Sequence, residues 1–149
     1  MNKIELRNKL TESLAQMYEM EAIGDLAEFL QGELHILQFM SGNKNMEINP
    51  SILSDKLHVS RPRITAALSA LRKKGYVTME ISDEDRRRMR VMLTPGGEDL
   101  INKKRENIEN YFDILVDGLG ENNVIDLIRL IDLSSQTMNK AMEKDNCIE

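Results

Sequence analysis

The chain has 149 residues and a formal net charge of −5, with 41% hydrophobic, 30% charged and only 4% aromatic residues. This length and composition predict one compact globular domain whose core consists mainly of aliphatic side chains and methionine. A single cysteine, Cys147, excludes an intramolecular disulfide and favours the reducing cytoplasm. No run of about 18 apolar residues occurs, which argues against a membrane-spanning helix, and the start of the chain lacks the apolar stretch of a secretory signal.

The charges are unevenly distributed along the chain. Residues 60–93 contain nine Lys or Arg and four Asp or Glu, a net charge of +5, whereas the rest of the chain contains 11 basic and 21 acidic side chains, a net charge of −10. A basic segment in an acidic chain can confine phosphate contact to one face, because the remainder repels nucleic acid. The pattern therefore favours a nucleic-acid partner for residues 60–93.

Two helical regions are predicted in the first part of the chain. Leucines and a methionine recur at helical spacing in a segment without Gly or Pro, which predicts a helix over residues 3–22. We expect Gly24 and Asp25 to break the chain there. A further helical region then follows as far as Ser41-Gly42-Asn43, where the sequence predicts a stop.

The next two helices are short and separated by a tight turn. Asn49 can cap a helix that has Pro50 in its first position, and only residues 58–59 separate this helix from the next one. Ser60 can cap that second helix, which is expected to end near Gly75. Two such helices form a helix-turn-helix, whose second helix can enter the major groove of duplex DNA.

A β-hairpin and two long helices complete the predicted fold. The sequence pattern of residues 76–93 predicts two strands joined by a long tip at residues 82–88. Thr94 can cap a long helix that stops at Gly118 and Gly120, a last helix follows, and we expect the polar tail after about residue 144 to be disordered. The predicted fold class is mainly α with a small β-hairpin wing, a winged helix-turn-helix with N- and C-terminal dimerisation helices.

The second short helix has a face suited to reading DNA. At about 100° per residue, Ile64, Leu68 and Leu71 lie on one side, opposite a face that is small at its centre and basic at its edges. Short side chains permit close approach, methyl groups can contact thymine, and Arg can hydrogen-bond guanine bidentately. The alternative is a solvated face of a core helix. The predicted DNA-binding residues are Ser60, Arg61, Pro62, Arg63, Thr65, Ala66, Ser69 and Lys73.

The hairpin tip carries three arginines, Arg86, Arg87 and Arg88, after the acidic run Asp83–Asp85. A basic loop beside the recognition helix can place an Arg in the adjacent minor groove. We expect Asp85 to hold an arginine through a bidentate pair, which positions the wing, and Arg87 to contact DNA. A metal site made of the three acids is a poorer interpretation, because it has neither a His nor a Gly-shaped loop. We therefore expect no metal and no other cofactor.

Several motifs follow one another in the order and spacing of a known family. They are Leu53-Ser-Asp-Lys-Leu57 with Val59-Ser60, then Ile64-Thr65, Leu71, Lys74-Gly75-Tyr76-Val77, Asp85-Arg86-Arg87 and Leu93-Thr94-Pro95-Gly96-Gly97. Over about residues 30–100 the chain resembles the MarR family of winged helix-turn-helix transcription regulators. The resemblance implies a homodimeric regulator, here expected to be a repressor, which binds a pseudo-palindromic operator and often releases it when a small ligand or oxidant acts. It also implies that Arg87 is the wing arginine and Asp85 the wing aspartate.

Two positions depart from the family pattern. Many members have an Arg directly after the Val/Ile-Thr pair and an Asp three residues later, whereas this chain has Ala66 and Ser69. Base readout is therefore expected to depend on Arg61, Arg63 and Thr65.

The terminal helices are expected to form a homodimer, because their apolar stripes exceed what a winged-helix core can cover. A twofold dimer sets its two recognition helices about one DNA turn apart, roughly 34 Å. We assign residues 3–22 and 98–143 to dimerisation helices, with most of the interface at 3–20 and 121–142. Residues 30–97 form the predicted DNA-binding lobe.

A small-molecule effector is expected to bind between the dimerisation helices and the DNA-binding lobe. Cys147 is a poor redox sensor, because its acidic neighbours disfavour the thiolate. The residues predicted to line the pocket are Met17, Tyr18, His35, Phe39 and Met40. Core packing is the more common role of such residues and is the alternative interpretation.

An enzyme is disfavoured, because the sequence has two His, one Cys and none of the common catalytic or phosphate-binding motifs. A winged helix used only for binding other proteins is the stronger alternative, but it would not need arginines on both the recognition helix and the wing. The sequence therefore predicts a homodimeric transcription regulator that binds double-stranded DNA sequence-specifically.

Overall fold

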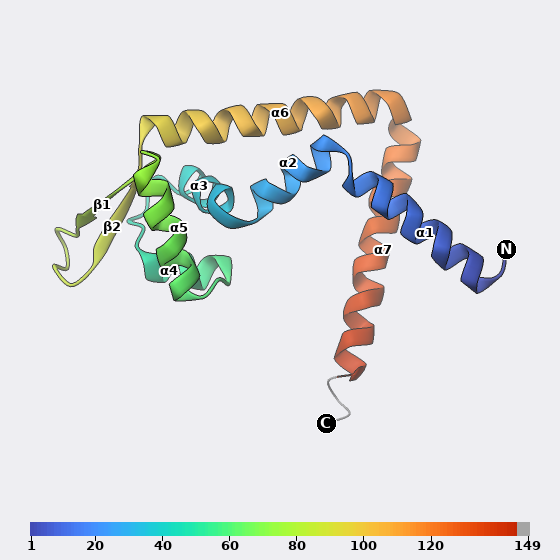
Figure 1. Cartoon of the computed structure of the whole chain (residues 1–149), viewed down its shortest axis with the longest axis horizontal. Coiled ribbons are helices and arrows are strands. Elements are labelled where there is room, and N and C mark those ends of the chain that lie inside the picture. The colour runs from blue at the N-terminus through green and yellow to red at the C-terminus, as the bar shows by residue number, and fades with distance from the viewer. Residues whose placement is uncertain (146–149) are drawn as a thin grey trace. The chain divides into compact units, whose positions relative to one another are not determined.

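The computed structural model describes residues 1–145, with side chains described as far as Glu143, so Cys147 and the end of the predicted disordered tail lie outside the described residues. The described part contains seven helices and one two-stranded antiparallel sheet (Figure 1). It forms two compact units, Met1–Ile108 and the chain from Glu109 onward. In this part of the chain no helix is both long and apolar enough to cross a lipid bilayer. The assignment of residues 30–97 to a DNA-binding lobe stays a prediction.

The first helix, α1 (Lys3–Tyr18), begins at a capping box. The Asn2 side chain accepts a hydrogen bond from the Glu5 amide at 3.0 Å, and the Glu5 carboxylate accepts one from the Asn2 amide at 3.0 Å. Both exposed amides at this helix end are thereby satisfied. All residues of α1 are exposed. Its apolar stripe is therefore exposed in the described chain.

The expected break at Gly24 was wrong, because Gly24 lies inside α2 (Glu21–Leu30). Helix α1 instead ends where Met20 adopts an extended backbone conformation. No Gly, Pro or capping side chain marks this boundary. Helix α2 buries Ala22 and Phe29, whereas α1 buries nothing, so tertiary packing and not local sequence sets the boundary.

The second helical region is also divided. Gln31 is extended and Gly32 has φ 63°, a left-handed conformation that glycine adopts without steric cost, so α3 (Gly32–Gly42) begins as a separate helix. The predicted stop at residues 41–43 is confirmed. Helix α3 contributes Ile36, Leu37 and Met40 to the core of the first unit, which they share with side chains from the helix-turn-helix and the wing.

The helix-turn-helix consists of α4 (Pro50–Leu57) and α5 (Arg61–Lys73). Asn49 caps α4 as predicted, because its Oδ1 accepts a hydrogen bond from the Ile52 amide at 2.9 Å. His58 lies in the turn with φ 53°, the left-handed conformation that closes many helix C-termini. Helices α4 and α5 contact each other, and the hairpin contacts both (Figure 1).

The wing is an antiparallel hairpin of β1 (Val77–Ile81) and β2 (Met89–Leu93), which pair with Val77 opposite Leu93. A third segment joins it, because the amide of Val91 donates a 2.8 Å hydrogen bond to the carbonyl of Ile48. The connector before α4 is thereby paired with the inner strand of the wing. No sequence pattern predicted this bridge.

Helix α6 (Pro95–Leu119) is capped by Thr94, as predicted. The Thr94 hydroxyl accepts a hydrogen bond from the Gly97 amide at 3.1 Å and donates one to the Gly75 carbonyl at 2.6 Å. Thr94 therefore joins the end of α5 to the start of α6. Further along, Lys104 pairs with Asp25 of α2 at 3.5 Å.

The second unit contains the end of α6 and the whole of α7 (Glu121–Asp145). Gly120, with φ 77°, separates the two helices, close to the stop predicted from the sequence. Helix α7 buries none of its described side chains. Apart from the half-buried Val124, its described apolar side chains are exposed, like those of α1.

Candidate nucleic-acid interface

The recognition helix α5 separates core residues from exposed residues as the helical wheel predicts. Ile64, Leu68 and Leu71 are buried, with exposed fractions of at most 1%. This packing fixes the rotation of the helix about its own axis, so the opposite face points to solvent. All the predicted DNA-binding residues of this helix are exposed, namely Ser60, Arg61, Pro62, Arg63, Thr65, Ala66, Ser69 and Lys73.

Two hydroxyl groups on this face differ in their hydrogen bonds. Thr65 donates its hydroxyl hydrogen to the Arg61 carbonyl at 3.0 Å, so it can offer DNA its methyl group and an acceptor but no free donor. Ser60 occupies the N-cap position of α5, but within the described residues its hydroxyl makes no capping hydrogen bond. The predicted capping role of the Ser60 side chain was therefore wrong, and the hydroxyl is available to a ligand.

The C-terminal end of α5 is anchored to α3. Lys74 donates a 2.7 Å hydrogen bond to the Glu33 carboxylate. This hydrogen bond and the charge of Glu33 raise the pKa of Lys74 above its usual value. Lys74 is thereby engaged within the protein, whereas Lys73 on the same helix forms no ion pair among the described residues.

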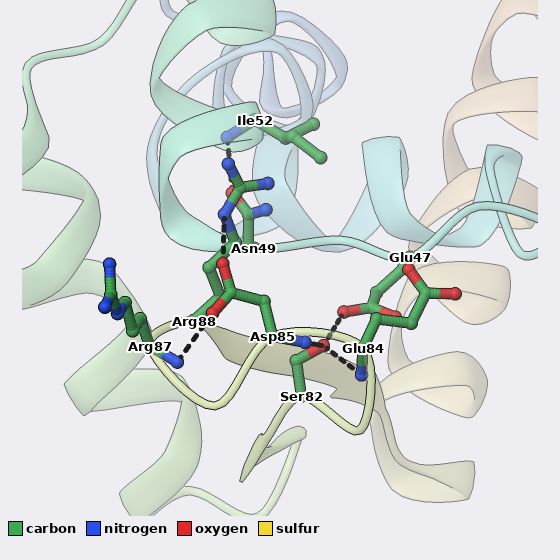
Figure 2. Close-up of polar contacts among 8 residues, drawn as sticks. All are labelled: Glu47, Asn49, Ile52, Ser82, Glu84, Asp85, Arg87 and Arg88. Carbon is green, nitrogen blue, oxygen red and sulfur yellow. Dashed lines mark hydrogen bonds and ion pairs between the residues drawn. The ribbon is translucent and has the colours of Figure 1, made fainter.

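All three wing arginines at the hairpin tip are exposed. Figure 2 shows two of them, Arg87 and Arg88, beside Asp85. Asp85 controls the tip in two ways: its Oδ1 accepts a hydrogen bond from the Arg87 amide at 2.9 Å, and its Oδ2 lies 3.6 Å from the Arg88 Nε. The tip is closed by the Arg88 amide, which donates to the Asp85 carbonyl at 2.9 Å. These contacts fold residues 85–88 into a compact turn.

The expected pairing of Asp85 with the arginines needs a correction in detail. Asp85 holds the backbone of Arg87, while the guanidinium that it pairs with is that of Arg88. Figure 2 shows the Arg88 side chain turned toward Asp85 and the Arg87 side chain turned away from it. A side-chain oxygen that accepts from the amide two residues on is a common turn geometry, and it leaves the Arg87 guanidinium outside the turn. Among the described residues, no group of His, Cys, Asp and Glu side chains has the arrangement of a metal site.

One residue of this region was not predicted from the sequence. Ser82, at the base of the tip, is 2% exposed, and its hydroxyl donates a 2.5 Å hydrogen bond to the Glu47 carboxylate. The same hydroxyl accepts hydrogen bonds from the amides of Glu84 at 3.3 Å and Asp85 at 3.4 Å. No local pattern could indicate this contact, because Glu47 is 35 residues away in the sequence.

The residues predicted to line an effector pocket do not surround one common cavity. Tyr18 borders a shallow hollow beside α2 and α3, His35 borders a different cavity, and Met40 borders a third beside the wing. Met17 is exposed on α1. Phe39 is half-buried on α3. The physical reason is that α1 ends at Tyr18 and packs little against α3, so the five side chains never converge.

The cavity beside His35 lies between α3, α4 and α5 and has a volume of about 430 Å³. Apolar side chains form much of its wall, and Arg63 of the recognition helix borders it together with Glu33 and His35. A predicted DNA-binding arginine therefore also lies at the rim of a surface cavity.

Comparison with known proteins gives consistent matches. Residues 29–88 match the family model described as MarR family. A relative, the HTH-type transcriptional regulator FarR of Neisseria gonorrhoeae, is 25% identical over 111 residues, which cover 74% of this chain and 75% of FarR. The crystal structure of Streptococcus pneumoniae FabT in complex with DNA has a TM-score of 0.69 at 19% identity, covering 91% of this chain and 99% of that chain. YusO from Bacillus subtilis has a TM-score of 0.70 at 15% identity, again covering 91% and 99%.

The matched segment contains the helix-turn-helix and the wing tip as far as Arg88, which are the elements whose geometry is described above. The solved structures cover about nine-tenths of this chain and almost all of their own length, so they share its fold. Over residues 29–88 the chain therefore matches the MarR family, and it is similar to a transcriptional regulator over a longer part of its length.

Proposed function

We propose that this chain binds double-stranded DNA sequence-specifically as a homodimer and represses transcription from a pseudo-palindromic operator. The observation that carries the proposal is the exposed face of α5 opposite its buried residues, beside a wing whose arginines are also exposed. Repression follows from occupancy, because a dimer that spans an operator excludes other proteins from the same DNA. The FabT structure, which contains DNA, supports the same mode of binding.

The two cationic elements suit different grooves. Helix α5 has small residues at Ala66 and Ser69 and arginines near its start, so it can approach the base edges of the major groove closely. The wing presents Arg87 on a narrow turn, which suits the minor groove. We therefore assign sequence specificity to α5. We attribute most of the wing's contribution to DNA affinity to the positive charge of its arginines.

A homodimer would cover two exposed apolar faces. Helix α1 exposes Leu6, Leu10, Leu14 and Met17 at helical spacing, and α7 exposes a comparable set of Ile, Leu and Met side chains. Exposed apolar stripes of this length mark protein interfaces. We therefore assign residues 3–20 and 121–142 to the interface. Sedimentation at micromolar concentration tests this assignment, and an exclusively monomeric species would contradict it.

The experiment that tests DNA binding is the selection of bound fragments from random duplex DNA by the full-length chain. We expect an enriched inverted repeat, because a twofold dimer presents two identical recognition helices. Affinity for that sequence should fall steeply with salt, with a logarithmic slope of about −0.9 for each phosphate contacted. A protein-interaction module would enrich no sequence.

The role of Arg87 is tested by Arg87→Ala. We expect normal folding, operator affinity about tenfold lower, and a salt slope reduced by about one for each subunit, since one charged contact is removed. Lys103→Ala is the matched control, because it removes one exposed positive charge from α6 outside the helix-turn-helix and wing. Equal affinity for the two variants would remove Arg87 from the DNA contacts.

We further propose that a small-molecule effector releases the operator by occupying the cavity between α3, α4 and α5. This cavity of about 430 Å³ is bordered by Arg63, so its occupant would compete with DNA for that side chain. Ala67→Leu would narrow the cavity, because Ala67 of α5 lines it. An inducer found by screening for operator release should lose its effect on this variant. An unchanged response would place the inducer elsewhere.

A further inference from the structure

The wing tip is connected to the helix-turn-helix by a continuous chain of polar contacts. Glu47 accepts the hydroxyl hydrogen of Ser82 at 2.5 Å, and Ser82 in turn accepts the amide of Asp85 at 3.4 Å (Figure 2). Asp85 then holds the Arg87 amide at 2.9 Å and the Arg88 guanidinium at 3.6 Å. Each member is fixed by the one before it, so the chain leads from the connector before α4 to the wing arginines.

Ser82 is saturated by these contacts. A serine hydroxyl has one hydrogen to donate and two lone pairs, and here Glu47 takes the hydrogen while the amides of Glu84 and Asp85 take the lone pairs. The residue is 2% exposed, so water cannot replace a lost partner without rearrangement. In addition, the Ser82 amide donates to the Arg88 carbonyl at 2.9 Å, which closes the base of the tip.

Glu47 is itself fixed in place by its neighbour in the chain. Ile48 accepts the 2.8 Å hydrogen bond from the Val91 amide, and Ile48 is buried. Asn49, the next residue, caps α4. Three consecutive residues of the connector therefore bind the wing tip, the inner strand of the wing and the first helix of the helix-turn-helix.

We propose that Glu47 and Ser82 are positioning residues for DNA binding. Together they hold the wing arginines in a fixed position relative to the recognition helix, although neither residue contacts DNA. This inference rests on the proposed function. Without the anchor, the tip would be joined to the lobe only through β1 and β2 and would lose conformational freedom when it entered a groove. That entropy loss would weaken binding.

The sign of the effect distinguishes this role from plain electrostatics. Glu47 carries a negative charge on the wing side of the lobe, so removal of that charge alone would strengthen attraction to DNA phosphates. The anchor predicts the opposite for Glu47→Ala, which removes the acceptor of the Ser82 hydroxyl. Glu47→Gln keeps an acceptor oxygen and loses the charge, so it separates the two effects.

The test measures operator affinity and its salt dependence for the full-length chain and six variants. We expect Glu47→Ala and Ser82→Ala to bind roughly threefold to tenfold more weakly than the unmodified chain, because the tip must now be ordered on binding. Their salt slopes should be smaller by up to about one for each subunit, since a loosened tip makes its phosphate contact in only a fraction of the complexes. Glu47→Gln should bind at least as tightly as the unmodified chain.

Glu84→Ala is the matched control. It removes an exposed carboxylate from the same tip and leaves the Glu84 amide bonded to Ser82, so its affinity should stay equal or rise. In an Arg87→Ala background, Ser82→Ala should lose most of its effect, whereas a general loss of fold stability would act equally in both backgrounds. If Ser82→Ala does not fold, Glu47→Ala decides.

Two results would overturn the inference. If Glu47→Ala binds as tightly as Glu84→Ala with an unchanged salt slope, Glu47 does not position the wing. If the unmodified chain binds no duplex DNA at all, the proposed function fails, and the anchor fails with it. Binding by the unmodified chain with unaffected alanine variants overturns the anchor alone.

Discussion

Gly97→Ala should destabilise the protein although it adds a single methyl group. Gly97 lies in the first turn of α6, and a Cβ atom built on it would lie 2.2 Å from the Tyr76 carbonyl oxygen and 2.8 Å from a methyl group of Leu93. The carbonyl cannot simply turn aside, because it also accepts the Thr94 amide at 3.1 Å. Helix α6 can therefore pack against the wing this closely only if residue 97 has no side chain.

The magnitude follows from the overlap. Real Cβ atoms do not approach an atom closer than 3.0 Å, so the backbone of α6 or of Tyr76 must move by about 0.8 Å. Forcing extra volume into a packed site costs about 1–3 kcal/mol, and the upper end applies because the obstructing atom is backbone. Replacement of glycine by alanine in a helix returns about 0.5–1 kcal/mol. The expected net loss is about 2 kcal/mol.

Gly96→Ala is the matched control in the neighbouring position. Its Cβ would lie 3.7 Å from the Thr94 hydroxyl and 3.8 Å from the Gly75 carbonyl, which are ordinary contacts. We expect it to be neutral or to stabilise the protein by up to about 1 kcal/mol.

Thermal unfolding followed by circular dichroism, at one fixed protein concentration, measures the difference between the two variants. At about 2–4 °C per kcal/mol for a chain of this size, Gly97→Ala should melt about 4–8 °C below the unmodified chain. A Gly97→Ala protein that melts at or above the Gly96→Ala protein would refute the packing argument.

Three further predictions concern single residues. His58→Gly should stabilise the protein by about 1 kcal/mol, because His58 is exposed and holds a left-handed conformation that glycine adopts freely; an unchanged denaturation midpoint would contradict this. Asn49→Ala should cost about 1 kcal/mol through loss of the α4 cap, with Asn49→Asp nearer to the unmodified chain in the same denaturation assay. The Lys44 hydrogen bond at 2.8 Å lowers the pKa of Glu98 below its usual value of 4.5, so the stabilisation by Glu98 is fully present above pH 4.5 and is lost as the pH falls through the lower folded-state pKa. The stability difference between the unmodified chain and Glu98→Gln should therefore shrink on acidification, and a constant difference from pH 7 to pH 3 would exclude the pairing.

The helix-turn-helix and wing were predictable because their signals are local. Asn49 and Pro50 mark the start of α4, Thr94 marks the start of α6, and the apolar spacing of α5 predicts which face is buried. Such signals depend on the chain within about one helical turn. The MarR resemblance rested on motifs in these same elements, and the family match covers residues 29–88, which include α4, α5 and the wing tip.

The breaks between the first three helices were less predictable. Met20 and Gln31 end helices without being helix breakers, and Gly24, a plausible breaker, lies inside one. Tertiary contacts set these helix boundaries, since α2 buries Phe29 and a longer α1 would not. Sequence periodicity cannot report such contacts.

Within the site, the sequence predicts that the wing arginines are exposed, but not which contacts hold them in place. The pattern Asp85-Arg86-Arg87 predicts a carboxylate beside arginines. Only the folded turn shows that this carboxylate contacts the backbone amide of Arg87 and the guanidinium of Arg88. The link from Ser82 to Glu47 depends on a pairing between the connector and β2, which only the folded chain shows.

The Thr94 hydroxyl has a mechanical consequence. It forms hydrogen bonds with Gly75, just after α5, and with Gly97 in the first turn of α6. Thr94 itself directly follows β2 in the chain. The helix-turn-helix and the wing are thus joined by this hydroxyl to the first turn of α6, the helix that leads on to the proposed dimer interface. In the proposed homodimer, a signal that tilts the start of α6 would therefore move α5 and the hairpin together. It would change the distance between the two recognition helices.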